Sequence, residues 1–273
     1  MRGEFIDLNG ARLYYYAAGT RGAGEPVVLI HGFPTSGHLW TEVVPHVPAG
    51  HRVVVLDLLG FGRSDRPRAR PVTVSAHADR TIQLFDALGI DRACVVGHDA
   101  GGGIAQSMAV RYPERVSRLC LVDSVAFDQW PRRRVKLVRA MMPVARHLPP
   151  ALLVPVLRGG LLRGYMDRGR GAHSAAHYVR PFRTTEGRDA LVQHLLELDP
   201  VDTATLALRL REVDRPTAIL WGEDDPFLPA GIARRLHDAV PNSTLDIIPG
   251  GRHFTPEEAP RRVGDVLAGL LRR

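Results

Sequence analysis

Short apolar runs rich in β-branched residues alternate with longer helical patterns along most of the chain. Two segments, Glu4–Asp7 and Ala11–Tyr16, flank the turn Asn9–Gly10, which predicts an antiparallel hairpin at a sheet edge. The pattern then predicts six buried strands, at Pro26–Ile30, Arg52–Leu58, Ala93–Val96, Leu119–Val122, Thr217–Trp221 and Thr244–Ile248. Strands that alternate with helices are typical of a mostly parallel sheet with helices on both faces. The predicted fold class is therefore α/β, with an eight-stranded sheet.

A long segment without a convincing strand separates Val122 from Thr217. We expect it to form a helical cap at residues 127–212, inserted after the sixth strand between core segments 1–126 and 213–273. A cap over the carboxyl ends of the strands would exclude water and shape a substrate pocket. Its predicted helical pieces are Arg133–Leu148, Ala151–Leu162, His173–Phe182 and Thr185–Leu198.

The composition adds limits on size and partners. With 273 residues, of which 45% are hydrophobic and 24% charged, the chain can build one large domain with a full core. Its formal net charge is +7, but the cationic residues are scattered and no basic stripe is interleaved with stacking aromatics. We therefore expect no nucleic-acid partner, and a monomer or a homodimer.

The amino-terminal residues and the cysteines indicate the compartment. Residues 1–7 carry an acid before any apolar run, and no apolar stretch reaches the ~20 residues of a membrane span. This predicts a cytoplasmic protein without a membrane partner. Cys94 and Cys120 fall in apolar strand-like runs, which favours buried free thiols over a disulfide or a metal pair.

The most informative stretch is Cys94–Gly103, where a buried strand runs into glycines and then into a helical pattern. A turn this sharp needs small residues two before and two after its apex. Gly97 and Gly101 supply them around Asp99. The pattern predicts a nucleophile elbow with an aspartate at its apex, and the alternative is a structural turn in which Asp99 only caps the helix.

Four further loops accompany this elbow: His31–Pro34, Asp57–Asp65, Trp221–Pro226 and Gly251–Phe254. Together the HGFP, DLLGFGRSD, GHDAG, WGEDDP and HF motifs resemble those of the α/β-hydrolase superfamily. Within it they are similar to the aspartate-nucleophile branch of epoxide hydrolases and haloalkane dehalogenases. The match covers nearly the whole chain outside the cap, and five motifs in one order are more specific than any one of them.

The resemblance implies a triad in the chain order nucleophile, acid and histidine. Asp99 corresponds to the nucleophile and His253 to the base, and Asp225, three residues after Gly222 and just before a proline, corresponds to the orienting acid. Some relatives place their acid at the end of the preceding strand, so Asp123 is the alternative acid. His31 is expected to hold its loop rather than to act as a second base.

A carboxylate nucleophile suits displacement at saturated carbon, because Asp99 is ionised near pH 7 and needs no base in the first step. An alkyl ester on Asp99 would then be hydrolysed by a water that His253 deprotonates. The backbone N–H groups of Phe33 and Ala100 are expected to form the oxyanion hole. We expect a small hydrophobic organic substrate and water as partners, with no cofactor and no metal.

The leaving group separates the two branches. Haloalkane dehalogenases usually bind halide with a tryptophan directly after the nucleophile, but Ala100 follows Asp99 here. Epoxide hydrolases use cap tyrosines that donate to the ring oxygen. Tyr178 and Tyr165 are the candidates, with a packing role as the alternative for each. Trp130 would line the pocket or pack at the cap hinge. These features favour an epoxide hydrolase over a haloalkane dehalogenase.

Two further classes stay open. In an esterase or lactonase, Asp99 would act as a general base toward water. In a non-hydrolytic cyclase or isomerase, the fold would bind a hydrophobic ligand and stop before water attacks. An alkyl-enzyme trapped on Asp99 would exclude the general base.

Overall fold

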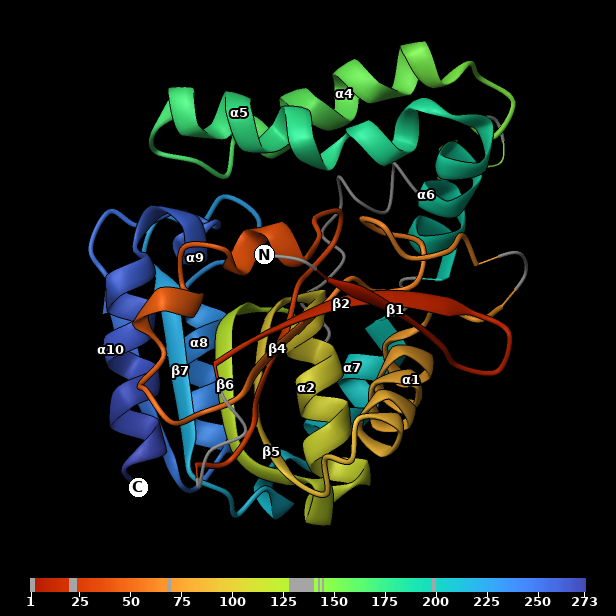
Figure 1. Ribbon diagram of the computed structural model, residues 1–273. Coiled ribbons are helices and arrows are strands. Elements are labelled where there is room, and N and C mark those ends of the chain that lie inside the picture. The colour runs from red at the N-terminus through yellow and green to blue at the C-terminus, as the bar shows by residue number, and fades with distance from the viewer. Residues whose placement is uncertain are drawn as a thin grey trace.

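The computed structural model describes residues 3–19, 24–67, 70–127, 140–141, 143, 145–197 and 200–273. Its centre is an eight-stranded sheet with the order β1-β2-β4-β3-β5-β6-β7-β8 (Figure 1). Strand β2 pairs antiparallel with β1 and β4, and all the other neighbours are parallel. The strands are β1 (Glu4–Asp7), β2 (Arg12–Ala18), β3 (Val27–Ile30), β4 (Val53–Leu56), β5 (Ala93–Asp99), β6 (Val116–Ser124), β7 (Thr217–Gly222) and β8 (Ser243–Ile248). This confirms the predicted fold class.

The edge hairpin forms as the sequence predicts. Asn9 and Gly10 have φ angles of 56° and 75°. Positive φ at both central residues is what a two-residue turn requires when it follows the right-handed twist of its strands. The turn thereby sets the register that pairs Asp7 with Arg12.

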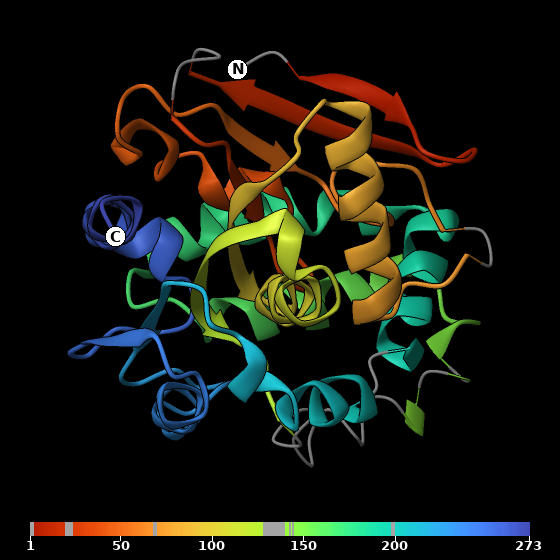
Figure 2. The ribbon, with the colours of Figure 1, turned by 90° about the horizontal axis from the view of Figure 1, so that it is seen from below.

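Helices cover both faces of the sheet, so side chains along each central strand alternate between two apolar cores (Figures 1 and 2). In β3, Val28 and Ile30 face the core shared with α1, α2 and α8, whereas Val27 and Leu29 face the core shared with α10. Both sets are fully buried, which explains why the strand lacks polar alternation. The helices of the core, outside the segments above the sheet, are α1 (Val74–Ala87), α2 (Ala100–Arg111), α7 (Pro200–Ala207), α8 (Gly231–Ala239), α9 (Thr255–Glu258) and α10 (Pro260–Leu271).

Four helical segments between β6 and β7 lie above the sheet in Figure 1 and are called the cap here. They are α4 (Pro150–Leu162), α5 (Arg168–Tyr178), the 3₁₀ turn η4 (Arg180–Arg183) and α6 (Thr185–Glu197). Helix α7 instead contacts α1 and α2, so the predicted cap range of 127–212 includes a helix that packs on the core. Most of the predicted helix Arg133–Leu148 lies outside the described residues.

Two smaller expectations concern the cysteines and membrane spans. Cys94 in β5 and Cys120 in β6 are buried free thiols, as predicted. Within the ranges that the structure describes, no helix has both the length and the apolarity needed to cross a bilayer.

The turn from β5 into α2 passes very close to neighbouring backbone. A Cβ on Gly97 would lie 2.1 Å from the carbonyl oxygen of Gly101, and one on Gly101 would lie 2.3 Å from that of Ile30. Both distances are far below van der Waals contact, so only glycine fits either position. The two glycines let α2 start directly above the end of β3.

Replacing Gly101 by Ala should therefore lower the free energy of unfolding by about 1–3 kcal/mol, because backbone atoms must move to admit the methyl group. Urea unfolding followed by circular dichroism measures the change. Gly160→Ala is the matched control: its Cβ meets no atom within 4 Å, so it should be neutral or stabilising by about 0.5–1 kcal/mol. Equal stability of wild type and Gly101→Ala would contradict the close packing.

Candidate active site

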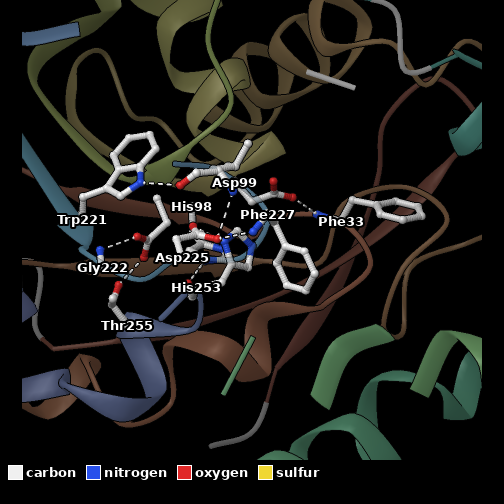
Figure 3. Close-up of polar contacts among 11 residues, drawn as sticks. Phe33, His98, Asp99, Trp221, Gly222, Asp225, Phe227, His253 and Thr255 are labelled. Carbon is white, nitrogen blue, oxygen red and sulfur yellow. Dashed lines mark hydrogen bonds and ion pairs between the residues drawn. The ribbon is translucent and has the colours of Figure 1, made fainter. Parts of the chain in front are cut away.

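Asp99 ends β5 and precedes α2 with φ 51° and ψ −120°, a conformation that L-residues rarely adopt. Backbone strain of this kind persists only where the surrounding structure enforces it, and it is common at functional sites. The side chain is 5% exposed, and its Oδ2 accepts a hydrogen bond of 2.9 Å from the backbone N–H of Phe33 (Figure 3). The Ala100 amide is a second backbone partner. The two amides expected to form the oxyanion hole therefore both meet the Asp99 carboxylate.

The surroundings of Asp99 have opposing effects on the pKa of its carboxyl group. Burial raises the pKa of its carboxyl, while His253 and the amides of Ala100 and Phe33 lower it, with a net result of about 6. Asp99 is thus ionised at neutral pH but poorly solvated. An anion that has lost its water is a more reactive nucleophile or base than one exposed to solvent.

His253 and Asp225 form a buried pair at the carboxyl ends of β8 and β7. The imidazole Nδ1 donates to Oδ2 of Asp225 over 2.7 Å, and Oδ1 of Asp225 accepts from the N–H groups of Phe227 (2.7 Å) and Leu228 (3.0 Å) (Figure 3). Burial alone would lower the pKa of His253, but the carboxylates of Asp225 and Asp99 outweigh it and raise the pKa to about 9. Asp225 therefore fixes both the orientation and the basicity of the imidazole.

Asp123, the alternative acid, has different partners. Its Oδ1 accepts from the N–H of Gly222 (2.8 Å) and its Oδ2 from the hydroxyl of Thr255 (2.5 Å). Burial and the nearby Asp225 carboxylate raise its pKa well above the usual range, which favours the neutral acid. Asp123 joins the strand before the acid loop to the segment after the histidine, while the hydrogen bond to His253 Nδ1 belongs to Asp225.

Two other histidines near the site bond to backbone. His31 donates from Nδ1 to the carbonyl of Gly32 and accepts at Nε2 from the N–H of Leu58, which agrees with the structural role expected for it. Burial lowers its pKa to about 4. His98, next to Asp99 in the chain, donates from Nε2 to the carbonyl of His253 over 2.9 Å. Sequence analysis does not predict this role, because nothing in a strand pattern reveals which backbone carbonyl a buried imidazole will contact.

The cap tyrosines lie together, at a carboxylate that the sequence did not single out. Tyr165 and Tyr178 are both 2% exposed, and both hydroxyls donate to Glu257 in α9. Trp130, the third residue expected at the pocket, lies outside the described residues. Among the residues that are described, no cluster of histidine, cysteine and carboxylate side chains could hold a metal ion.

Comparison with known proteins places this geometry in a family. A model of the alpha/beta hydrolase fold matches residues 25–152. RutD of Caulobacter sp. (strain K31), a protein named for carbamate hydrolysis, is 31% identical over 253 residues, which cover 90% of each chain. The chain belongs to the α/β hydrolase family.

Two further likenesses extend over almost the whole of this α/β hydrolase. Haloalkane dehalogenase 2 of Mycobacterium tuberculosis is 28% identical over 271 residues, covering 95% of this chain and 91% of the relative. The crystal structure of an alpha/beta hydrolase fold protein from Burkholderia ambifaria superposes with a TM-score of 0.87 at 26% identity, covering 99% and 97% of the two chains. In this family the residues at the carboxyl ends of the strands, rather than the fold, decide the reaction.

Asp225 is the main group that raises the pKa of His253. Asp225→Asn should therefore bring that pKa from about 9 to below its ordinary value of about 6.5, because the lowering effect of burial then becomes the largest. Asp123→Asn should leave the His253 pKa much closer to 9. An NMR pH titration of the His253 ring measures both. A larger fall in Asp123→Asn than in Asp225→Asn would make Asp123 the orienting acid.

Proposed function

We propose that this α/β hydrolase opens epoxides through an alkyl-enzyme ester on Asp99, which water then hydrolyses to a vicinal diol. The observation that carries the proposal is the carboxylate at the apex of the elbow, bonded to the Phe33 amide and backed by the His253–Asp225 pair. A carboxylate at this position has no proton to lose. It can therefore attack saturated carbon without help from the histidine.

In the first step an oxygen of Asp99 bonds to one ring carbon, the carbon–oxygen bond of the ring breaks, and its electron pair goes to the departing oxygen. That oxygen needs a proton. Tyr178 and Tyr165 are the cap hydroxyls proposed to donate it, and each would exchange its bond to Glu257 for one to the substrate. The product of this step is a hydroxyalkyl ester of Asp99.

In the second step His253 removes a proton from water, and the hydroxide oxygen bonds to the carbonyl carbon of the Asp99 ester. Negative charge then develops on the former carbonyl oxygen, where the N–H groups of Phe33 and Ala100 stabilise it. Collapse breaks the bond to the alkoxide, which leaves as the diol when His253 returns the proton. Asp225 keeps the imidazole in the tautomer that this step requires.

Haloalkane dehalogenation is the second candidate, because a relative named for that activity is 28% identical to this chain. It would use the same Asp99 ester with halide as leaving group. Halide binding needs N–H donors near the nucleophile, but Ala100 offers no side-chain donor and the indole N–H of Trp221 donates to the carbonyl of Leu228. These two positions favour oxygen over halide as the leaving atom.

His253→Gln should trap the ester, because the first step proceeds and the second lacks its base. After incubation with aryl and alkyl epoxides, mass spectrometry should find the Asp99 peptide heavier by the full mass of the epoxide. Asp99→Asn in the same background is the control and should carry no adduct. An adduct from haloalkanes alone would establish the second candidate, and no adduct from any panel would favour Asp99 as a general base or a non-hydrolytic reaction.

The pKa values predict that both steps slow at low pH, each below a different pKa. Ester formation needs ionised Asp99, so its rate should fall about tenfold per pH unit below about pH 6. Ester hydrolysis needs neutral His253, so its rate should fall as pH drops through the pKa of the imidazole. That pKa should lie below about 9 in the ester, because the Asp99 charge that helps to raise it is gone. Single-turnover stopped-flow kinetics across the pH range resolves both limits.

A further inference from the structure

One carboxylate outside the triad is buried where the cap meets the core. Glu257 in α9 is 5% exposed, and its oxygens accept from the hydroxyls of Ser174 (2.6 Å), Tyr165 (3.1 Å) and Tyr178. Burial raises its pKa, and the three hydroxyls lower it again. Hydroxyls of the cap therefore replace the water that this carboxylate gave up on folding.

The same part of the cap also bonds to the backbone of the catalytic histidine. The carbonyl of Gly164, in the loop between α4 and α5, accepts from the N–H of His253 (3.1 Å) and from that of Phe254 (3.3 Å). The ring of Tyr165 stacks on Phe254 with a centroid distance of 4.3 Å and an interplanar angle of 22°. The cap thus contacts both the start and the end of the segment His253–Glu257.

The core contacts that segment independently of the cap. His98 donates to the carbonyl of His253, Thr255 donates to Asp123, and the His253 ring donates to Asp225. The core contacts fix the ring and the carbonyl side of His253. Its N–H is bonded to the cap, so the histidine reaches its full set of partners only when the cap is docked.

We propose that Glu257 is a positioning residue that couples docking of the cap to the placement of His253. The kinetic test of this inference rests on the proposed function. Ester formation uses Asp99 and a proton from a cap tyrosine but not His253, whereas ester hydrolysis needs His253. Loss of the Glu257 charge should therefore slow the second step far more than the first.

Glu257→Gln tests the proposal, because it keeps the size of the side chain and removes the strong acceptor of three hydroxyls. The matched control is Glu42→Gln, which breaks the ion pair of 2.6 Å between Glu42 and Arg170. That pair also joins α5 of the cap to the core, but in the described part of the chain neither side chain has a hydrogen bond to the segment His253–Glu257. Ser174→Ala, which deletes one of the three hydroxyls, should act in the same direction as Glu257→Gln with a smaller effect.

The kinetic measurement is a single-turnover experiment, and its substrate is an epoxide that forms the Asp99 ester in His253→Gln. In Glu257→Gln the rate constant of ester hydrolysis should fall about 10- to 100-fold, the range expected when a catalytic group is displaced by a fraction of an ångström to an ångström. Ester formation should fall much less in the same variant, because the amide oxygen of the substituted side chain still accepts from the tyrosine hydroxyls. Both constants should stay near wild type in Glu42→Gln. Equal losses in both steps, or equal losses in both variants, would overturn the proposal.

A second measurement needs no substrate. The proton between His253 Nδ1 and Asp225 should give a low-field proton NMR signal in the free protein, because the hydrogen bond of 2.7 Å is buried. That signal should broaden or move in Glu257→Gln and persist in Glu42→Gln. An unchanged signal in Glu257→Gln would overturn the positioning role. If no ester forms even in His253→Gln, the proposed function fails, and the NMR result alone decides the role of Glu257.

Discussion

The close passage of the β5–α2 turn over β3 is the constraint on which the site depends. Without a side chain at Gly97 and Gly101, helix α2 begins directly above the carboxyl end of β3. That approach brings the loop after β3 to Asp99, so the Phe33 amide can bond to the carboxylate. It also forces Asp99 into its positive φ, which lifts the side chain out of the sheet. The bond between the Phe33 amide and the Asp99 carboxylate thus follows from one close approach of the backbone.

Burying several carboxyl groups around one imidazole costs electrostatic free energy. His253 interacts electrostatically with three buried carboxyl groups, those of Asp99, Asp123 and Asp225. Three negative charges there would repel one another in a poorly solvated space. Backbone amides stabilise the charges on Asp99 and Asp225, while the neutral form is favoured for Asp123. The carboxyl that bonds to the histidine is the one whose other oxygen has two amide donors.

Much of the fold could be predicted from the sequence, because its signals are local. Apolar runs gave the strands, Asn9–Gly10 gave the hairpin, and the glycines around Asp99 gave the elbow. The predicted triad partners also came from short motifs at strand ends. Their mutual bonds, such as the one between His253 and Asp225, are consequences of strand order rather than of any one motif.

What the sequence did not reveal are contacts between segments far apart in the chain. Glu257 stands beside a second acid, Glu258, and nothing near it in the sequence marks Tyr165, Tyr178 and Ser174 as its partners. The sequence offers Tyr178 and Tyr165 as candidate proton donors, but it does not show that both hydroxyls bond to Glu257. Cap register follows from packing on the core, which one sequence pattern cannot supply.

The sequence separation of these partners also has a kinetic meaning. The segment around His253 bonds to residues near positions 98, 123, 164 and 225, so its native place exists only after strands and insertion have met. Closing such long loops costs conformational entropy before the new contacts stabilise the chain, so these contacts form late in folding. His253 is therefore expected to be among the last parts of the chain to become native. A molecule in which His253 has all of these partners has completed its folding.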